Sequence, residues 1–162
     1  MTKPIDLEGP RTFVAPRVCL AAEIKPSTLR TWRKRGFVVV EKEHERGWTL
    51  YSAGDLLRIC VLARLVRAGV DLGLASRIVI GLSDAGELKR ALDGKASFVT
   101  VSKIEVNVDD PKKPSGPAFE VQWSATRRFP LEESADSTDS VGLVIDVAKI
   151  LRRVKRVLAE AD

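Results

Sequence analysis

A short cationic helix that ends at a glycine constrains the fold of this chain most. Pro26 suits the first turn of a helix, where a missing N–H costs nothing, and Gly36 suits the position just after a helix end. Leu29 and Trp32 lie three residues apart and therefore share one side of that helix. The sequence predicts a helix from Pro26 to about Arg35 with one buried face.

Two short strand-like segments follow this helix. Phe37 to Val40 is an apolar, β-branched run, Glu41 to Gly47 is a polar turn, and Trp48 to Tyr51 is predicted to pair back as a second strand. Pro16 is expected to open an additional helix before the cationic one. The predicted order is therefore helix, helix and hairpin.

Two more helices are predicted after the hairpin. Ser52 and Asp55 have the spacing of a capping box, and Gly69 follows the last apolar residue of the helical pattern. Asp71 is a suitable cap for the next helix. The apolar residues at helical spacing in these two segments are Leu56, Ile59, Cys60, Ala63, Val66, Leu74, Ile78 and Leu82.

The positive charge of the chain is concentrated in its first half. The net charge is +5, and residues 83–162 contain slightly more acidic than basic residues, so residues 1–82 supply all of the excess. Five cations and no acid lie from Lys25 to Arg35. Such a run is either a solvated face or a phosphate-binding surface, and its place on a short helix near aromatic residues favours phosphate binding.

This order of elements resembles the N-terminal domain of MerR-family transcription regulators. The motifs that carry the resemblance are Thr28-Leu29-Arg30-x-Trp32 through Gly36-Phe37, Gly47-Trp48-x-Leu50-Tyr51-Ser52, and Asp55 through Ala68-Gly69-Val70-x-Leu72. The resemblance implies a winged helix-turn-helix whose dimers bind near-palindromic promoter DNA, with the second helix in the major groove and the hairpin on the flanking backbone. The expected DNA-binding residues are Lys25, Ser27, Thr28, Arg30, Arg33, Lys34, Arg35, Arg46 and Trp48.

The sequence departs from the MerR pattern at three positions. Glu23 stands where the family usually has a turn glycine, which indicates a differently shaped turn. Thr49 replaces a wing arginine that contacts phosphate, and Arg46 is close enough to take over that role. Trp32 replaces a tyrosine and either packs under the helix, the interpretation we favour, or contacts the DNA backbone.

The second half has a different pattern, so the fold class is α+β. Ser97 to Val108 is strand-like with a bulge or turn near Lys103, residues 109–117 form a loop, and Phe119 to Trp123 alternates as a half-buried strand does. These segments predict a small antiparallel hairpin or sheet.

A long amphipathic helix is predicted to end the chain, over about residues 141–159. Its apolar stripe has the spacing of a coiled-coil seam. The stripe either covers the small sheet or joins two copies of the chain, and the expected dimerisation residues are Leu143, Val147, Ile150, Val154 and Val157. The predicted domains are a flexible lead-in (1–12), a DNA-binding domain (13–82) and a small α+β domain with the dimerisation helix (83–162).

The composition argues against a membrane protein, a secreted protein or an enzyme. The chain has no apolar run long enough to span a bilayer and no signal-peptide pattern at its beginning. Cys19 and Cys60 lie in apolar patterns, which favours buried thiols in a reducing cytoplasm. The single histidine, His44, lies in a polar turn, and no catalytic or zinc spacing is found. We expect no enzymatic activity, no metal and no other cofactor.

Three functions are compatible with these patterns. The leading hypothesis is a sequence-specific transcription regulator that binds double-stranded DNA as a homodimer. The alternative is a DNA-anchored adaptor, such as an antitoxin or phage accessory protein, whose C-terminal half binds another protein. A third hypothesis is small-molecule sensing with Phe119 and Trp123 lining a pocket, although these aromatics are better explained as core residues.

Overall fold

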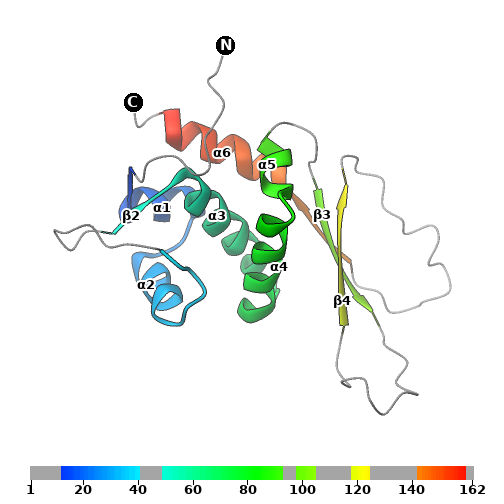
Figure 1. The fold of residues 1–162 in the computed structure, drawn as a ribbon. Helices are drawn as coiled ribbons and strands as arrows, with labels where there is room; N and C mark the ends of the chain where they lie inside the picture. Colours follow the sequence, from blue (N-terminus) through cyan, green and yellow to red (C-terminus); the bar gives the residue numbers. More distant parts are fainter. Residues whose placement is uncertain (1–11, 41–48, 93–97, 105–117, 125–141, 160–162) are drawn as a thin grey trace.

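The computed structural model describes residues 12–40, 49–92, 98–104, 118–124 and 142–159. The helices gather into one group, and a three-stranded sheet extends from one side of it (Figure 1). The elements are β1 (Phe13–Val14), α1 (Ala15–Ala22), α2 (Pro26–Lys34), β2 (Leu50–Tyr51), α3 (Ala53–Arg67), α4 (Leu72–Asp84), α5 (Glu87–Leu92), β3 (Phe98–Ile104), β4 (Ala118–Ser124), β5 (Gly142–Asp146) and α6 (Val147–Ala159).

The cationic helix α2 forms as expected. Pro26 occupies its first turn, and Arg35 is its C-cap. Gly36 has a φ of 76°, which a side chain would strain, and its amide donates to the carbonyl of Arg33 at 3.0 Å. The next amide, of Phe37, donates to the carbonyl of Trp32 at 2.9 Å and closes the helix end.

Among the described residues, the predicted pairing of Phe37–Val40 with the strand that ends at Tyr51 is wrong, while Trp48 lies outside them. Residues 37–40 form no strand, and β2 pairs instead with β1, placing Phe13 opposite Tyr51. The amide of Phe37 caps α2 and so is not available to a strand partner. The carbonyl of Tyr51 accepts from the amide of Thr12 at 3.1 Å, so β2 is bound to the segment before α1.

Helix α3 lies at the centre of the helical group. Its capping box is present: the amide of Asp55 donates to Ser52 Oγ at 3.0 Å, and the amide of Ser52 donates to Asp55 Oδ2 at 2.9 Å. Its residues are buried on nearly all sides because α1, α4 and α6 pack around it. Asp71 caps α4 as predicted, by accepting from the amides of Gly73 and Leu74.

The antiparallel sheet of the second half is confirmed and is larger than a hairpin. Its strand order is β4-β3-β5 with both pairs antiparallel, and Val101 lies between Val121 and Leu143. The pairing of β3 with β4 runs without interruption through Lys103, so the expected bulge is absent from the described strand.

The C-terminal helix begins later than the predicted start near residue 141. Gly142–Asp146 forms strand β5, and α6 begins at Val147. The Asp146 side chain accepts from the amide of Lys149 at 2.9 Å, which sets the helix start. Leu143 therefore belongs to the sheet and not to the helical stripe.

Helix α6 closes the core formed by the helices of the first half. It packs against α3 and α1, with additional contacts to α5 and β3 (Figure 1). Its buried residues share one core cluster with α1, α3 and α4, and they are Val147, Ile150, Leu151, Val154 and Val157. Four of the five expected dimerisation residues are thus buried within their own chain, while their dimerisation role itself stays a prediction. None of the described helices is long and apolar enough to cross a membrane.

Candidate nucleic-acid interface

Helix α2 is held by one face and presents the other to solvent. Leu29 and Trp32 are 2 % and 6 % exposed. The indole of Trp32 therefore packs under the helix, which is the interpretation favoured from the sequence. Thr31 Oγ1 donates to the carbonyl of Ser27 at 2.9 Å on the exposed side. The buried pair fixes the rotation of α2 about its axis and therefore decides which side chains face outward.

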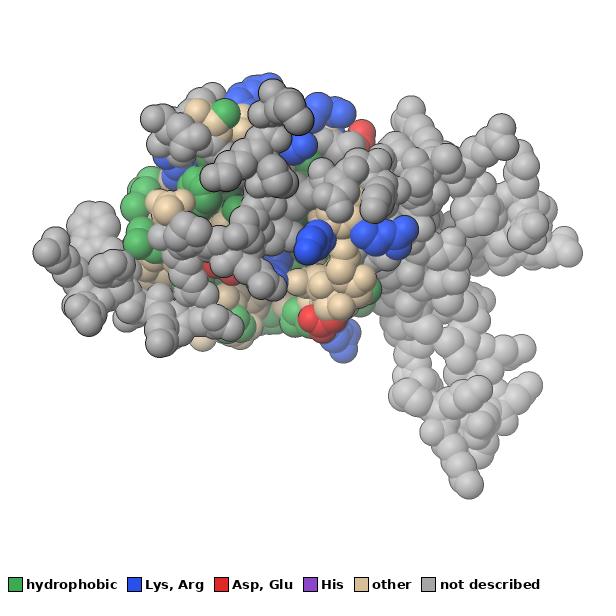
Figure 2. All heavy atoms as spheres, turned by 45° about the horizontal axis from the view of Figure 1, so that its top comes forward, with side chains coloured by type: hydrophobic (Ala, Val, Ile, Leu, Met, Phe, Trp, Pro, Cys, Tyr) green, Lys and Arg blue, Asp and Glu red, His purple; other side chains and the backbone are tan. Residues whose placement is uncertain are grey.

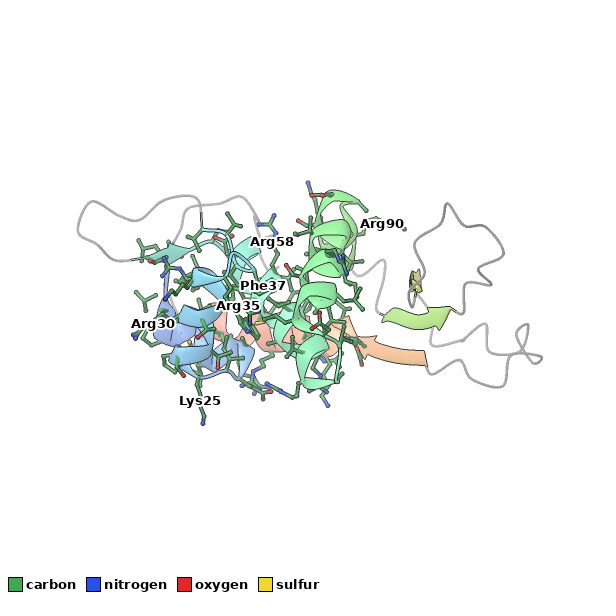
Figure 3. All side chains as sticks on the ribbon, turned by 90° about the horizontal axis from the view of Figure 1, so that it is seen from below. Lys25, Arg30, Arg35, Phe37, Arg58 and Arg90 are labelled. Carbon is green, nitrogen blue, oxygen red and sulfur yellow. The ribbon has the colours of Figure 1, made fainter. Side chains whose placement is uncertain are left out.

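Four cations on or beside α2 are exposed, namely Lys25, Arg30, Lys34 and Arg35. Figure 3 shows Lys25 and Arg30 pointing away from the ribbon at the α2 end of the molecule, far from Arg90 on α5. Helix α2 contains no acidic residue, and Ser27 at its exposed N-terminal turn lies at the positive end of the helix dipole. This surface therefore has the charge and the shape to receive phosphates.

Arg33 differs from its neighbours because it is half-buried. Its positive charge acts on the buried side chain of Tyr51: burial raises the pKa of Tyr51, and the charge of Arg33 opposes that rise. Arg33 is therefore partly engaged by the protein itself. Thr28 is also half-buried.

A shallow depression lies beside the cationic face. It has a volume of about 490 Å³ and is lined by Arg30, Arg33, Lys34, Gly36 and Val38–Val40. Arg35 caps the same end of α2, with its guanidinium 5.2 Å from the centre of the Phe37 ring, a cation–π contact that limits its freedom. Figure 3 shows these two side chains close together.

The wing residues lie outside the described residues. These are Arg46, Trp48 and His44, so the expected wing contacts are not placed by the structure. Positive charge also reaches other surfaces, because the described charged side chains on the face in Figure 2 are mostly Lys and Arg. Positive charge alone therefore does not identify α2 as the DNA-binding surface. In addition, buried Leu29 and Trp32 fix which side of α2 faces solvent.

The turn between α1 and α2 contains a feature that the sequence did not predict. Glu23 has a φ of 55° and is the only described residue other than glycine with a positive φ. Arg67 of α3 and Arg153 of α6 each form an ion pair with its carboxylate. The hydrogen bond from Arg67 is the largest reason why the pKa of Glu23 is lowered, and Arg153 and Arg64 add to it. No local pattern in the sequence signals these distant partners.

A comparison with known protein families finds a match that includes most of α1, the turn after it and α2. Residues 17–80 match the model of the MerR HTH family regulatory protein. No curated protein matches the chain. The match covers less than half of the chain and includes α2, β2, α3 and most of α1 and α4. Such domains are typical of DNA-binding transcription regulators that are not enzymes. Residues 17–80 of this chain are thus similar to the helix-turn-helix domain of MerR-family regulators.

Proposed function

We propose that the chain is a sequence-specific transcription regulator that binds a near-palindromic DNA site as a homodimer. The observation that carries the proposal is the cationic, acid-free outer face of α2, whose rotation is fixed by buried Leu29 and Trp32. Arg30 and Lys34 are the exposed residues best placed for the groove and its phosphates, with Lys25, Ser27, Thr28, Arg33 and Arg35 beside them. Arg46 and Trp48 of the predicted wing would contact the flanking backbone.

The test begins with purified protein and fragmented genomic DNA, followed by sequencing of the bound fraction. A recurring near-palindromic site supports the proposal. Uniform, salt-sensitive retention without a motif contradicts it, because phosphate contacts alone carry no sequence information.

Arg30→Ala tests the role of α2 on the recovered site. If Arg30 contacts a phosphate, the slope of log K against log salt concentration should become about one unit shallower. If Arg30 contacts a base, the variant should lose about 1–3 kcal/mol of binding free energy and discriminate less between DNA sequences. Arg77→Ala is the matched control, since Arg77 is an exposed arginine on α4. Equal affinity of both variants and the wild type would exclude Arg30 from the interface.

Dimerisation needs its own measurement because the α6 stripe is buried within the chain. We propose that the two copies meet on DNA, with one α2 in each half-site. Sedimentation of the protein with a full site and with a half-site tests this stoichiometry. Two copies per full site support the homodimer, and one copy contradicts it.

One observation favours the adaptor as a second candidate function. Within the described strands, β4 and β5 each pair only with β3, so both have an edge without a described partner. Such an edge is suited to strand addition by another protein. A stoichiometric partner that co-purifies with the chain and is lost when residues 98–146 are replaced would favour the adaptor over a self-sufficient regulator.

A further inference from the structure

The turn that joins α1 to α2 adopts a conformation suited to glycine but contains Glu23. This residue is the C-cap of α1, with φ 55° and ψ 44°. The turn is closed by the amide of Ile24, which donates to the carbonyl of Cys19 at 3.1 Å. A side chain in the left-handed region is unfavourable by itself, so other contacts must hold it there.

Two guanidinium groups hold Glu23, one on each carboxylate oxygen. Arg67 Nη1 pairs with Oε2, and Arg153 Nη1 pairs with Oε1. We call Glu23, Arg67 and Arg153 the Glu23 clasp. Each guanidinium also binds the backbone of the turn: Arg67 Nη2 donates to the carbonyls of Ala22 at 3.2 Å and Glu23 at 3.0 Å, and Arg153 Nη2 donates to the carbonyl of Leu20 at 2.9 Å.

These extra bonds distinguish the clasp from an ordinary surface ion pair. An exposed pair contributes little because both side chains must be ordered. Here Arg153 projects from α6, and Ile150 and Val154 on either side of it are 9 % and 1 % exposed, so the helix that presents Arg153 is held in the core. Arg153 therefore connects α6 to the carbonyl of Leu20 in the last turn of α1.

The clasp links the two halves of the chain. Leu20 and Arg153 are 133 positions apart in sequence, yet they are hydrogen-bonded. Helix α6 begins directly after β5, so a displacement of the sheet would move α6 and, through Arg153, the turn before α2. We infer that Arg153 is a positioning residue through which the C-terminal half holds the helix-turn-helix in its DNA-binding geometry. This inference rests on the proposed DNA-binding function.

A double-mutant cycle in the full-length protein tests the inference. Arg153→Ala removes the α6 half of the clasp, and Glu23→Gly removes the carboxylate while leaving a residue that adopts the turn without strain. Arg152→Ala is the matched control, since Arg152 is an exposed neighbour on the same helix. Affinity for the recovered DNA site is measured by fluorescence anisotropy at several salt concentrations.

We expect Arg153→Ala to weaken specific binding by on the order of fivefold in the wild-type background, the lower range of coupling between distinct sites. The loss should be clearly smaller in the Glu23→Gly background, the salt dependence should not change, and Arg152→Ala should have no effect. Equal losses in both backgrounds with a shallower salt dependence would mean that Arg153 contacts DNA directly, which overturns the inference. No loss in either background overturns it too.

Hydrogen exchange separates a failure of this inference from a failure of the proposed function. In protein without DNA, Arg153→Ala should speed exchange of the Ile24 amide, and Arg152→Ala should not. Unchanged exchange contradicts the clasp whether or not DNA binds. Faster exchange in a protein that binds no specific site contradicts only the proposed function. If Arg153→Ala does not fold, Arg153→Lys replaces it, because an ammonium cannot bind the carboxylate and a carbonyl through a planar fork.

Discussion

Glu23 shows how one side chain compensates for an unfavourable backbone conformation. Its left-handed φ is available to glycine at no steric cost, and its carboxylate receives two guanidinium groups that glycine could not bind. At the position where the resemblance to MerR proteins implies a turn glycine, Glu23 therefore keeps a φ that glycine favours and adds a tertiary contact. Because the contact is charged, it responds to pH.

Acidification should weaken the contribution of Glu23 to stability. The hydrogen bond from Arg67, with the charges of Arg153 and Arg64, lowers the pKa of Glu23 in the folded protein. A lowered folded pKa means that the stabilisation is complete above the unfolded pKa, at about 4.3, and is lost as the pH falls through the folded pKa.

The measurement is urea unfolding of the wild type and Glu23→Gln over a pH series. The difference in their free energies of unfolding should stay constant near neutral pH and shrink below the ordinary range of glutamate. A difference that is constant down to acid pH would show that the charge of Glu23 does not stabilise the fold.

The two cysteines should be unreactive in the native protein. Both are 5 % exposed, and burial raises the pKa of Cys19 and raises that of Cys60 to about 12. The thiolate is the reactive form, so labelling with a thiol reagent near neutral pH should be slow until the protein is unfolded. Cys19→Ser assigns the remaining signal to Cys60. Rapid labelling of that variant under native conditions would contradict the burial of Cys60.

At the scale of elements, the ends of helices are decided by short-range hydrogen bonds. Ser52 and Asp55 start α3, Asp71 starts α4, and Gly36 follows the end of α2. These positions are predictable from sequence because cap and helix lie within a few residues. The sequence places the start of α6 too early because its apolar spacing continues into β5, and the pairing of β5 with β3 decides the boundary.

Removal of the α3 cap should be costly because α3 is central to the core. Ser52→Ala deletes the acceptor of the Asp55 amide, and the expected loss is about 1 kcal/mol in the free energy of unfolding. Ser27→Ala, at an exposed position within α2 and not at its cap, should change the free energy by less than about 0.5 kcal/mol. Urea unfolding compares them, and equal small losses would show that the capping box contributes nothing.

At the scale of the whole molecule, α6 belongs to the same core as the helices of the first half. Its buried stripe contacts α1 and α3, so the N-terminal domain obtains part of its core from the last residues of the chain. The predicted boundary near residue 82 is thus crossed by tertiary packing. Folding of the DNA-binding half should depend on the C-terminal helix.

Leu151→Ala tests this dependence. Leu151 is 4 % exposed, so the truncation should lower the free energy of unfolding by about 2–5 kcal/mol while the protein still unfolds in one transition. Leu20→Ala is the matched control, because Leu20 is 63 % exposed and should change the free energy by less than about 0.5 kcal/mol. Unchanged stability with a loss of oligomer in sedimentation would instead support the stripe as a dimer seam.

The sequence by itself determined the features that depend on neighbouring residues. The capping box, the cationic outer face of α2 and the β3–β4 pair all follow from patterns within one or two segments. The burial of Trp32 also follows from its spacing to Leu29.

Only the tertiary structure decided the pairings between distant segments. The pairing of β2 with β1, the place of α6 in the core and the Glu23 clasp join residues far apart in the chain. Helical periodicity predicts that an apolar stripe will be buried but does not predict which surface will cover it. Any apolar surface of suitable shape provides the same hydrophobic driving force. The choice of partner depends on which surfaces the other elements leave open, and that is a property of the whole fold.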